Sequence, residues 1–246
     1  MSRRPAPPPA DDGKMQRCRW HPQADRAALQ RTALMRILEA AAAARQQRGE
    51  FHLVLAGGET PRDIYRLLGA VPADWAAWHI YFGDERCLPP DDPARNSRMA
   101  GYAWLDHVPI PPRQIHPIPG ELGAVQAAAA YEETLRTVGR FDLVLLGLGE
   151  DGHTASLFPG QDWRRAPEDL DVLPIYDAPK APPQRVSLSP ARLARTRQLI
   201  FLVDGRNKHQ AVADWRAGKD IPARHIAPPG GVDVLVEASL LVEPFE

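Results

Sequence analysis

Residues 141–160 read FDLVLLGLGEDGHTASLFPG, and they are the clearest indication of the fold class in the chain. Residues 141–146 are apolar except for one aspartate, a pattern typical of a short strand that is buried on both faces. Four glycines follow between residues 147 and 160, with charged and polar residues between them. The stretch therefore predicts a buried strand that runs straight into a glycine-rich loop at its carboxyl end.

The rest of the chain alternates between apolar runs and helical segments. We expect further strands at residues 51–56, 78–82, 172–176, 185–188, 199–203 and 232–236. The spacing of Leu29, Leu34 and Leu38 predicts a helix. This helix starts at Asp25 and stops at Gly49, and others are expected from residue 60 and over residues 96–105, 122–138 and 208–216. Apolar strands alternating with helices predict a single α/β domain, with a mainly parallel, doubly wound, Rossmann-like sheet flanked by helices.

The charge balance is nearly neutral, with 30 Lys and Arg residues against 31 Asp and Glu residues. Proteins that bind nucleic acid or an acidic membrane usually carry a basic excess, so we expect neither as a partner. No apolar run approaches the roughly 18–20 residues that span a bilayer. The two cysteines, Cys18 and Cys87, form no CxxC motif and indicate a reducing compartment.

The amino-terminal residues differ in composition from the rest of the chain. Residues 1–16 are rich in proline and polar residues. We expect them to form a disordered tail, because such a stretch buries little apolar surface. The tail also lacks the apolar segment of a secretory signal. We therefore expect residues 17–246 to form the folded domain of a cytoplasmic protein, which is a monomer or a small homo-oligomer.

A first candidate loop, GGETP at residues 57–61, joins an expected strand to an expected helix. Gly57 and Gly58 let backbone N–H groups approach a ligand closely, while Thr60 is a suitable N-cap and Pro61 suits a first helical turn. Free N–H groups at the start of a helix form an anion site. A plain, well-capped turn would have the same sequence, so this loop alone does not decide between the two interpretations.

A second candidate loop, GDER at residues 83–86, follows the expected strand 78–82. Its Asp84 and Arg86 either face a ligand at the carboxyl end of the strand or belong to a solvated turn. Downstream, Asn96 and Ser97 stand where the next helix is expected to begin. Their amide and hydroxyl groups suit sugar hydroxyls, or simply cap the helix. The sequence leaves open which of these two residues faces a substrate.

The third loop has GxGxxG spacing at residues 147–152. A dinucleotide-binding fingerprint requires a helix that opens at its third glycine. Here Pro159 and Gly160 interrupt the segment soon afterwards, which argues against such a helix. We interpret the loop instead as one that presents Asp151 and His153 to a pocket, where the carboxylate orients the imidazole for proton transfer.

Two further cations stand at the starts of expected elements. Arg185 begins the expected strand 185–188, and Lys208 begins the expected helix 208–216. Each alone is most simply a surface residue. Together with Arg86 they can hold a doubly charged phosphate, because guanidinium groups bind its oxygens in a planar fork and the ammonium adds a point charge.

These loops, in this order, resemble the 6-phosphogluconolactonase family over roughly residues 20–240. The segments that carry the resemblance are LAGGETP (55–61), FGDER (82–86), RNSRMA (95–100), LGLGEDGHTASLFPG (146–160), RVSLS (185–189) and GRNKHQAV (205–212). The stretch 146–160 is the most specific of them. The GGxTP and DGH elements are shared with glucosamine-6-phosphate deaminases, which resemble this family in structure.

The resemblance implies that His153 is the base that activates water, with Asp151 beside it. It also implies a set of residues around the phosphate and sugar, namely Gly58, Thr60, Arg86, Arg185 and Lys208. Three departures from the family pattern are visible. Cys87-Leu88 follows GDER where valine is expected nearby, Asn96 precedes Ser97 where the reverse order is common, and Glu237-Ala238 matches only loosely.

The expected function is hydrolysis of 6-phospho-D-glucono-1,5-lactone to 6-phospho-D-gluconate by general-base activation of water. A lactone is an activated ester, so this reaction requires neither a metal nor a cofactor, and no Cys/His cluster suggests zinc. One alternative is a glucosamine-6-phosphate deaminase/isomerase, although residues 154–159 lack the carboxylate which that family places after its histidine. The other is a non-catalytic sugar-phosphate-binding protein. Regulators of that kind carry a helix-turn-helix, for which the roughly 20 residues before the first helix are too few.

Overall fold

The computed structural model describes residues 16–165, 167 and 170–242. The expected disordered tail, residues 1–16, therefore lies outside the described residues except for its last member. Gln16 belongs to the folded domain, because its side-chain amide donates hydrogen bonds to the carbonyls of Ala223 and Ile226 at 2.8 and 2.7 Å. The domain begins no later than Gln16, one residue before the expected boundary.

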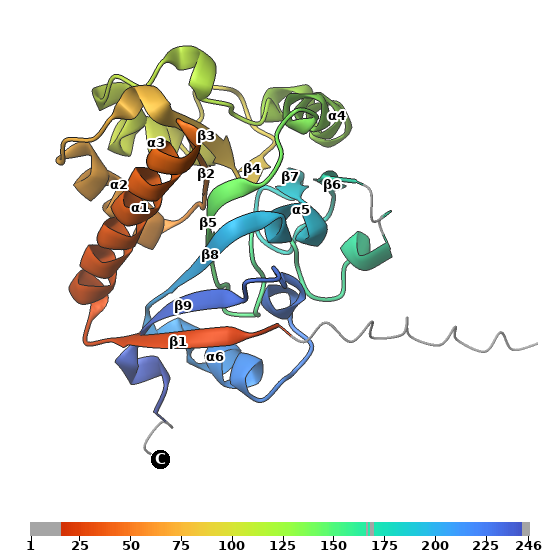
Figure 1. Cartoon of the computed structure of the whole chain (residues 1–246). Coiled ribbons are helices and arrows are strands. Elements are labelled where there is room, and N and C mark those ends of the chain that lie inside the picture. Colours follow the sequence, from red (N-terminus) through yellow and green to blue (C-terminus); the bar gives the residue numbers. More distant parts are fainter. Residues whose placement is uncertain (1–15, 166, 168–169, 243–246) are drawn as a thin grey trace, which may run out of the picture.

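Six strands form the main sheet in the order β1-β9-β8-β5-β2-β3, and every neighbouring pair is parallel (Figure 1). Their bounds are β1 (Cys18–Gln23), β2 (Phe51–Leu55), β3 (Trp78–Phe82), β5 (Phe141–Gly147), β8 (Thr196–Val203) and β9 (Val232–Glu237). The expected parallel sheet is thus confirmed. The edge strand β1 was not expected, because its sequence CRWHPQ has no apolar run.

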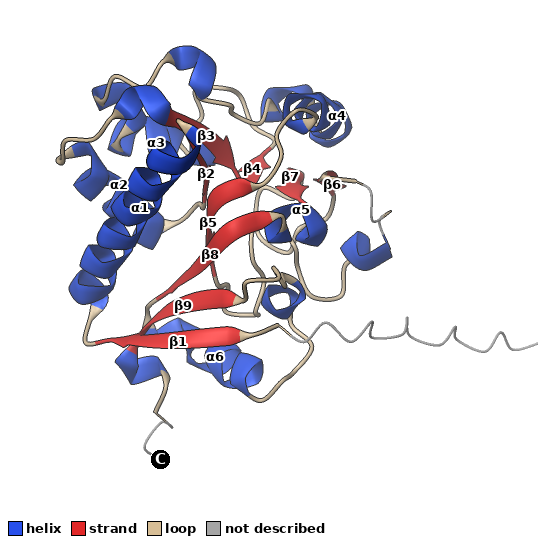
Figure 2. Cartoon of the chain, viewed as in Figure 1, coloured by secondary structure: helices blue, strands red, loops and turns tan. Residues whose placement is uncertain are grey.

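Helices cover both sides of this sheet, with α1, α2 and α3 on one side and α4 and α5 on the other (Figure 2). Their bounds are α1 (Arg26–Arg48), α2 (Glu59–Gly69), α3 (Asn96–Ala103), α4 (Ala124–Leu135), α5 (Pro190–Ala194) and α6 (His209–Arg216). Helix α1 begins where expected, because the Asp25 side chain accepts a hydrogen bond from the Ala28 N–H, and it ends at Gly49 with φ of 84°. No helix among the described residues is long and apolar enough to cross a membrane.

A second, smaller sheet consists of three antiparallel strands in the order β4-β7-β6. Their bounds are β4 (Asp84–Arg86), β7 (Arg185–Leu188) and β6 (Val172–Ile175). The strands expected at 172–176 and 185–188 exist, but they belong to this sheet and not to the parallel one. The segment 84–86, expected as a loop, is a strand. An apolar run predicts burial, whereas the partner of a strand depends on which distant segment lies beside it.

The order in which successive strands are added to the sheet reverses between β2 and β5, which are parallel neighbours in the main sheet. From β2 the chain continues to β3 on one side, whereas from β5 the next strand of the sheet, β8, lies on the other side. The loops that leave the carboxyl ends of β2 and β5 therefore separate and leave a crevice between them. In open α/β sheets this switch point is where ligands bind.

Candidate active site

A cavity of about 220 Å³ opens at this switch point. Its wall includes eight of the ten residues expected at the site, namely Gly57, Gly58, Asp84, Arg86, Asn96, His153, Arg185 and Lys208. The two remaining residues do not line it: Asp151 lies behind His153, and the Thr60 side chain is bound elsewhere. The motifs singled out in the sequence are thus brought together by the carboxyl ends of the strands.

His153 is held by Asp151 in an orientation suited to proton transfer. Its ring Nδ1 is hydrogen-bonded to the Asp151 carboxylate, and its backbone N–H donates to the same oxygen at 3.2 Å. Burial alone would raise the pKa of Asp151, but its hydrogen bonds and the charge of His153 outweigh burial and lower that pKa to about 2. Asp151 is therefore an ionised acceptor at neutral pH, which favours the tautomer with its proton on Nδ1 and leaves Nε2 as the basic nitrogen.

The glycine-rich loop packs closely against the imidazole of His153. A Cβ atom on Gly149 would come within 2.6 Å of the His153 Cγ and closer still to Nδ1, so only glycine lets the ring lie there. The Gly149 N–H donates to the His153 carbonyl at 2.7 Å, and the Gly152 N–H donates to the Gly149 carbonyl at 3.1 Å. Residues 148–161 contain turns, bends and an isolated β-bridge but no helix, so none opens at Gly152 as a dinucleotide-binding fingerprint would require.

Of the two candidates Asn96 and Ser97, Asn96 lines the cavity. Its amide Nδ2 donates to the backbone carbonyl and the carboxylate of Asp84, at 2.9 and 3.0 Å. A Cβ atom on Gly57 would come within 2.7 Å of the Asn96 Cγ, so this glycine is required for the close approach. The other Asp84 oxygen accepts a hydrogen bond from the buried Ser156 hydroxyl at 2.6 Å. Asp84 is thereby held in place at the cavity wall.

Glu85 is a positioning residue that the sequence analysis did not single out. Its side chain is fully buried, and its carboxylate accepts hydrogen bonds from the backbone N–H groups of Asn96 and Ser97, at 2.7 and 2.8 Å. A carboxylate at this position satisfies the first free N–H groups of α3 and interacts favourably with the helix dipole. Glu85 therefore anchors the start of α3 and with it Asn96. The acidic residue beside Asp84 was the only signal in the sequence.

Four cations line the cavity: Arg86, Lys180, Arg185 and Lys208. The Arg185 guanidinium is fixed by hydrogen bonds to the carbonyls of Lys180, Ala181 and Pro182 at 3.0–3.2 Å. Burial lowers the pKa of both Arg185 and Lys208 from their ordinary values. A partly desolvated cluster of like charges favours a multiply charged anion such as phosphate. Lys180 was missed, because nothing distinguishes a single lysine in a proline-rich loop from a solvated one.

Thr60 does not act as the N-cap of α2, contrary to expectation. Helix α2 begins one residue earlier, its N-cap is Gly58 with φ of 107°, and no side chain caps it. The Thr60 hydroxyl instead donates a hydrogen bond to Asp204. The N–H groups of the first turn therefore remain without a side-chain cap beside the cavity, where they can bind an anion.

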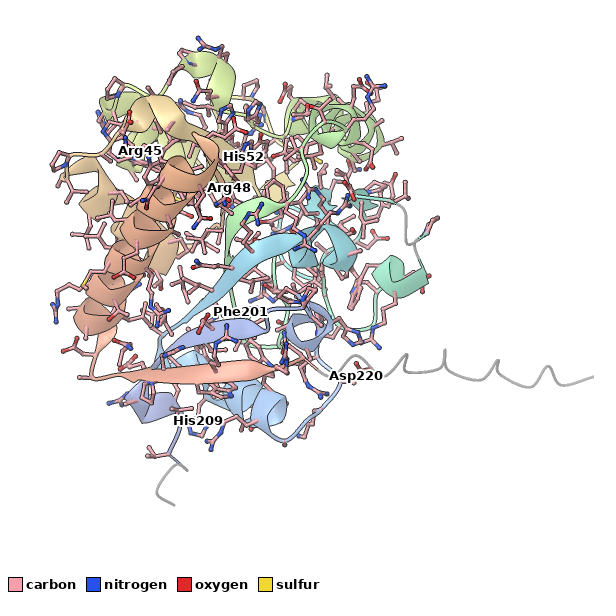
Figure 3. All side chains as sticks on the ribbon, in the orientation of Figure 1. Arg45, Arg48, His52, Phe201, His209 and Asp220 are labelled. Carbon is pink, nitrogen blue, oxygen red and sulfur yellow. The ribbon has the colours of Figure 1, made fainter. Side chains whose placement is uncertain are left out.

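A second cavity, of about 410 Å³, lies at the opposite end of the sheet, where β2, β3 and β5 begin. Figure 3 shows two residues of its wall, Arg48 and His52, side by side. Both bind Asp142: the guanidinium at 2.8 Å and the backbone N–H of His52 also at 2.8 Å. The imidazoles of His52, His79 and His116 are stacked nearly parallel. None of the expected site residues lines this cavity, and no metal-binding group of three or more His, Cys, Asp or Glu side chains occurs in the described part of the chain.

The stacked imidazoles predict a loss of stability in weak acid. Burial, followed by the charges of His79 and His52, lowers the pKa of His116 to about 4, below the 6.5 of a free histidine. The unfolded chain therefore binds more protons between these values, so the contribution to stability is complete above pH 6.5 and is lost as the pH falls toward 4.

Urea unfolding at pH 7.5 and pH 5 measures this effect in the parent and in His116→Gln, which cannot titrate. Because the imidazole is only partly buried, solvent screens the effect, and we expect the parent to lose about 1 kcal/mol more than the variant. Equal losses in the two proteins would show that His116 is not held neutral by the fold.

The fold and the site together define the class of protein: a doubly wound α/β domain with a His–Asp pair and a basic pocket at its switch point. A family model described as "Glucosamine-6-phosphate isomerases/6-phosphogluconolactonase" matches residues 24–235. The chain belongs to this family.

Several relatives within the family are named 6-phosphogluconolactonase. The chain is 37% identical to a 6-phosphogluconolactonase of Synechocystis sp. over 197 residues. The aligned region covers 75% of this chain and 80% of the relative. The chain is 36% identical over 228 residues to one of Nostoc sp., covering 87% and 93%. Among solved structures, the 6-phosphogluconolactonase of Trypanosoma brucei has a TM-score of 0.81 at 27% identity, covering 92% of this chain and 98% of that one. A monomeric glucosamine-6-phosphate deaminase, at 19% identity and a TM-score of 0.76, shares the fold.

Proposed function

We infer that this chain is a 6-phosphogluconolactonase, which hydrolyses 6-phospho-D-glucono-1,5-lactone to 6-phospho-D-gluconate in the oxidative branch of the pentose phosphate pathway. The observation that carries the proposal is the His153–Asp151 pair at the wall of a cavity that four cations also line. The relatives of the same name at 36–37% identity support it. We further propose a cytoplasmic location, in keeping with two free cysteines.

In the proposed mechanism, His153 Nε2 removes a proton from a water molecule as the water oxygen attacks C1 of the lactone. The carbonyl electrons move onto its oxygen and form a tetrahedral oxyanion. When this intermediate collapses, the bond between C1 and the ring oxygen breaks, and the ring oxygen takes a proton from the imidazolium. Asp151 stabilises the imidazolium between these steps, and general-base assistance of this kind contributes roughly 10²–10⁴-fold to the rate.

The oxyanion requires a hydrogen-bond donor or a cation. The sequence allowed either the N–H groups of the glycine-rich loop or a nearby cation. Two of those N–H groups, of Gly149 and Gly152, donate within the loop itself. A cation of the cavity wall is therefore the better candidate, and the Lys180 ammonium group is available there.

A deaminase of the same fold is the competing function, and the residues around His153 argue against it. In the deaminase family a carboxylate soon after the histidine serves as its acidic partner. Residues 154–159 contain none here, and Asp151 is the one carboxylate hydrogen-bonded to His153 within the described chain. Among the described residues, the site thus provides a base for water and no second carboxylate hydrogen-bonded to that base.

The first test compares the phosphorylated lactone with unphosphorylated glucono-1,5-lactone. If Arg86, Arg185 and Lys208 bind phosphate, loss of that group leaves them without their partner, and kcat/KM should fall by at least roughly 10²-fold. Lactone consumption is followed at neutral pH against the spontaneous rate, and glucosamine 6-phosphate deamination is assayed in parallel. Similar turnover of both lactones would refute the phosphate site, and deamination without lactone hydrolysis would refute the proposed function.

A further inference from the structure

Lys208 stands at the end of a short turn, residues 204–208, that follows β8 and is fixed at three points. At its start the Asp204 side chain is bound to Thr60 and Arg26. In its middle the Gly205 N–H donates to the Glu237 carboxylate at 3.2 Å. Near its end the Asn207 amide donates to Glu150 at 2.7 Å. This Lys208 turn is therefore connected to the start of α2 and to the loop that carries His153.

The contact with the start of α2 is the most buried of the three. The Asp204 side chain is only 9% exposed, and both of its oxygens have partners. One accepts a hydrogen bond from the Thr60 hydroxyl, and the other lies 2.8 Å from the Arg26 Nε. A second nitrogen of Arg26 lies 3.5 Å from the Thr60 hydroxyl. The three side chains form a closed cluster, which we name the Asp204 cluster.

The Asp204 cluster stands behind two separate parts of the cavity wall. Thr60 follows Gly58, the uncapped start of α2, by two residues, and Asp204 precedes Lys208 by four. Gly58 and Lys208 both line the cavity, whereas neither Thr60 nor Asp204 does. Burial lowers the pKa of Lys208, and the charges of Glu150, Asp151 and Asp204 oppose this effect. A change at Asp204 therefore reaches the cavity through the residues that it positions.

We propose that Asp204 is a positioning residue for the phosphate: it holds the Lys208 turn against the start of α2, so that the ammonium and the uncapped N–H groups converge on one anion. The inference rests on the proposed function only in taking the anion to be the phosphate of the lactone. Hydrogen-bond donors bind an anion more tightly when they are already fixed in place, because binding then costs no conformational entropy for ordering them. Thr60 acts through its hydrogen bond to Asp204, which explains how it can contribute without lining the cavity itself.

Two nearly isosteric substitutions each remove one interaction of this cluster: Asp204→Asn the ion pair with Arg26, and Thr60→Val the hydroxyl hydrogen bond. Asp204→Asn keeps the size of the side chain and removes its charge, which frees Arg26 to move toward Glu59 and Asp63, at 3.6 and 4.0 Å. Thr60→Val removes the hydroxyl without changing Asp204, and Thr60→Ser restores it. Asp214→Asn is the matched control, because Asp214 lies on α6 and is ion-paired with Lys219 at 2.7 Å, away from the cavity.

Steady-state kinetics with both lactones, and calorimetric titration with inorganic phosphate, test the proposal. For Asp204→Asn and Thr60→Val we expect KM for the phosphorylated lactone and the Kd for phosphate to rise roughly 10- to 100-fold, as when a partner that orients a ligand group is lost. We expect kcat to stay within about threefold, and turnover of the unphosphorylated lactone to stay unchanged, since neither residue touches the reacting atoms. Thr60→Ser and Asp214→Asn should resemble the parent.

A purely structural role predicts a different result, namely a lower melting temperature and equal losses with both lactones. That result would overturn the proposal, as would a phosphate Kd within about twofold of the parent in both variants. The phosphate titration does not depend on turnover. A parent that binds phosphate and loses this binding in Thr60→Val, but hydrolyses no lactone, would sustain the role of Asp204 and remove the proposed function. A parent that does not bind phosphate would overturn the role of Asp204 whatever the lactonase assay shows.

Discussion

Replacing His153 by alanine is expected to lower kcat by roughly 10²–10⁴-fold, the usual contribution of a general base. The reason is the geometry of the His–Asp pair: Asp151 occupies Nδ1, and Nε2 has no hydrogen-bond partner among the described residues. The affinity for 6-phosphogluconate should change little, because the cations of the cavity wall remain. His153→Asn should not restore activity, since an amide can donate a hydrogen bond but cannot take up a proton.

The measurement is kcat at saturating lactone, with product affinity from calorimetry and a circular dichroism spectrum as the check on folding. A folded His153→Ala protein that keeps more than about a tenth of the parental kcat would rule out a general base at this position. Such a protein would leave His153 with a role only in shaping the loop.

The second large effect is expected from adding one methyl group, in Gly149→Ala. The new Cβ would come within 2.6 Å of the His153 Cγ, so the imidazole must turn away from it and from Asp151. A displacement of about 1 Å in a catalytic group can cost roughly 10²-fold, so kcat should fall by at least that factor. The melting temperature should change much less, because a side chain at the cavity wall can move without disturbing the core.

Gly139→Ala is the matched control for this substitution. A Cβ on Gly139 has no neighbour within 4 Å, and this glycine lies at the far end of β5, away from the catalytic cavity. It should therefore keep the parental kcat. If Gly149→Ala also kept it, the imidazole would not lie over Gly149 during catalysis, and His153 would act from an orientation other than the one that Asp151 holds.

The parallel sheet was predictable because its strands are buried on both faces. Such strands read as continuous apolar runs, and the segment at 78–82 was predicted with the bounds that it has in the structure. The strand β1 was not predicted because none of its residues is buried and its sequence CRWHPQ contains no apolar run. The three charged residues of β4 resembled a turn although Asp84 and Glu85 are buried, because the hydrogen bonds that satisfy their carboxylates come from distant segments.

Most of the candidate site was predictable for a topological reason. Parallel strands end at the same edge of a sheet, so the motifs that follow β2, β3 and β5 must meet there, and the sequence shows which motifs they are. The direction of each side chain was not predictable. Thr60 points away from the cavity to Asp204, and Lys180 joins the wall from a loop that carries no motif.

The α/β class, the family and the His153–Asp151 pair could be identified from the amino-acid sequence, because strand burial and a glycine-rich motif are local patterns that can be read from consecutive residues. The folded arrangement was needed to show that Asn96 rather than Ser97 faces the cavity, that Glu85 anchors α3, and that Asp204 binds Thr60. The physical reason is that these contacts join segments far apart in the chain: Asp204 and Thr60 are separated by 144 residues. Such contacts depend on how closely the elements pack and on which way each side chain points, and neither property leaves a periodic pattern in a single sequence.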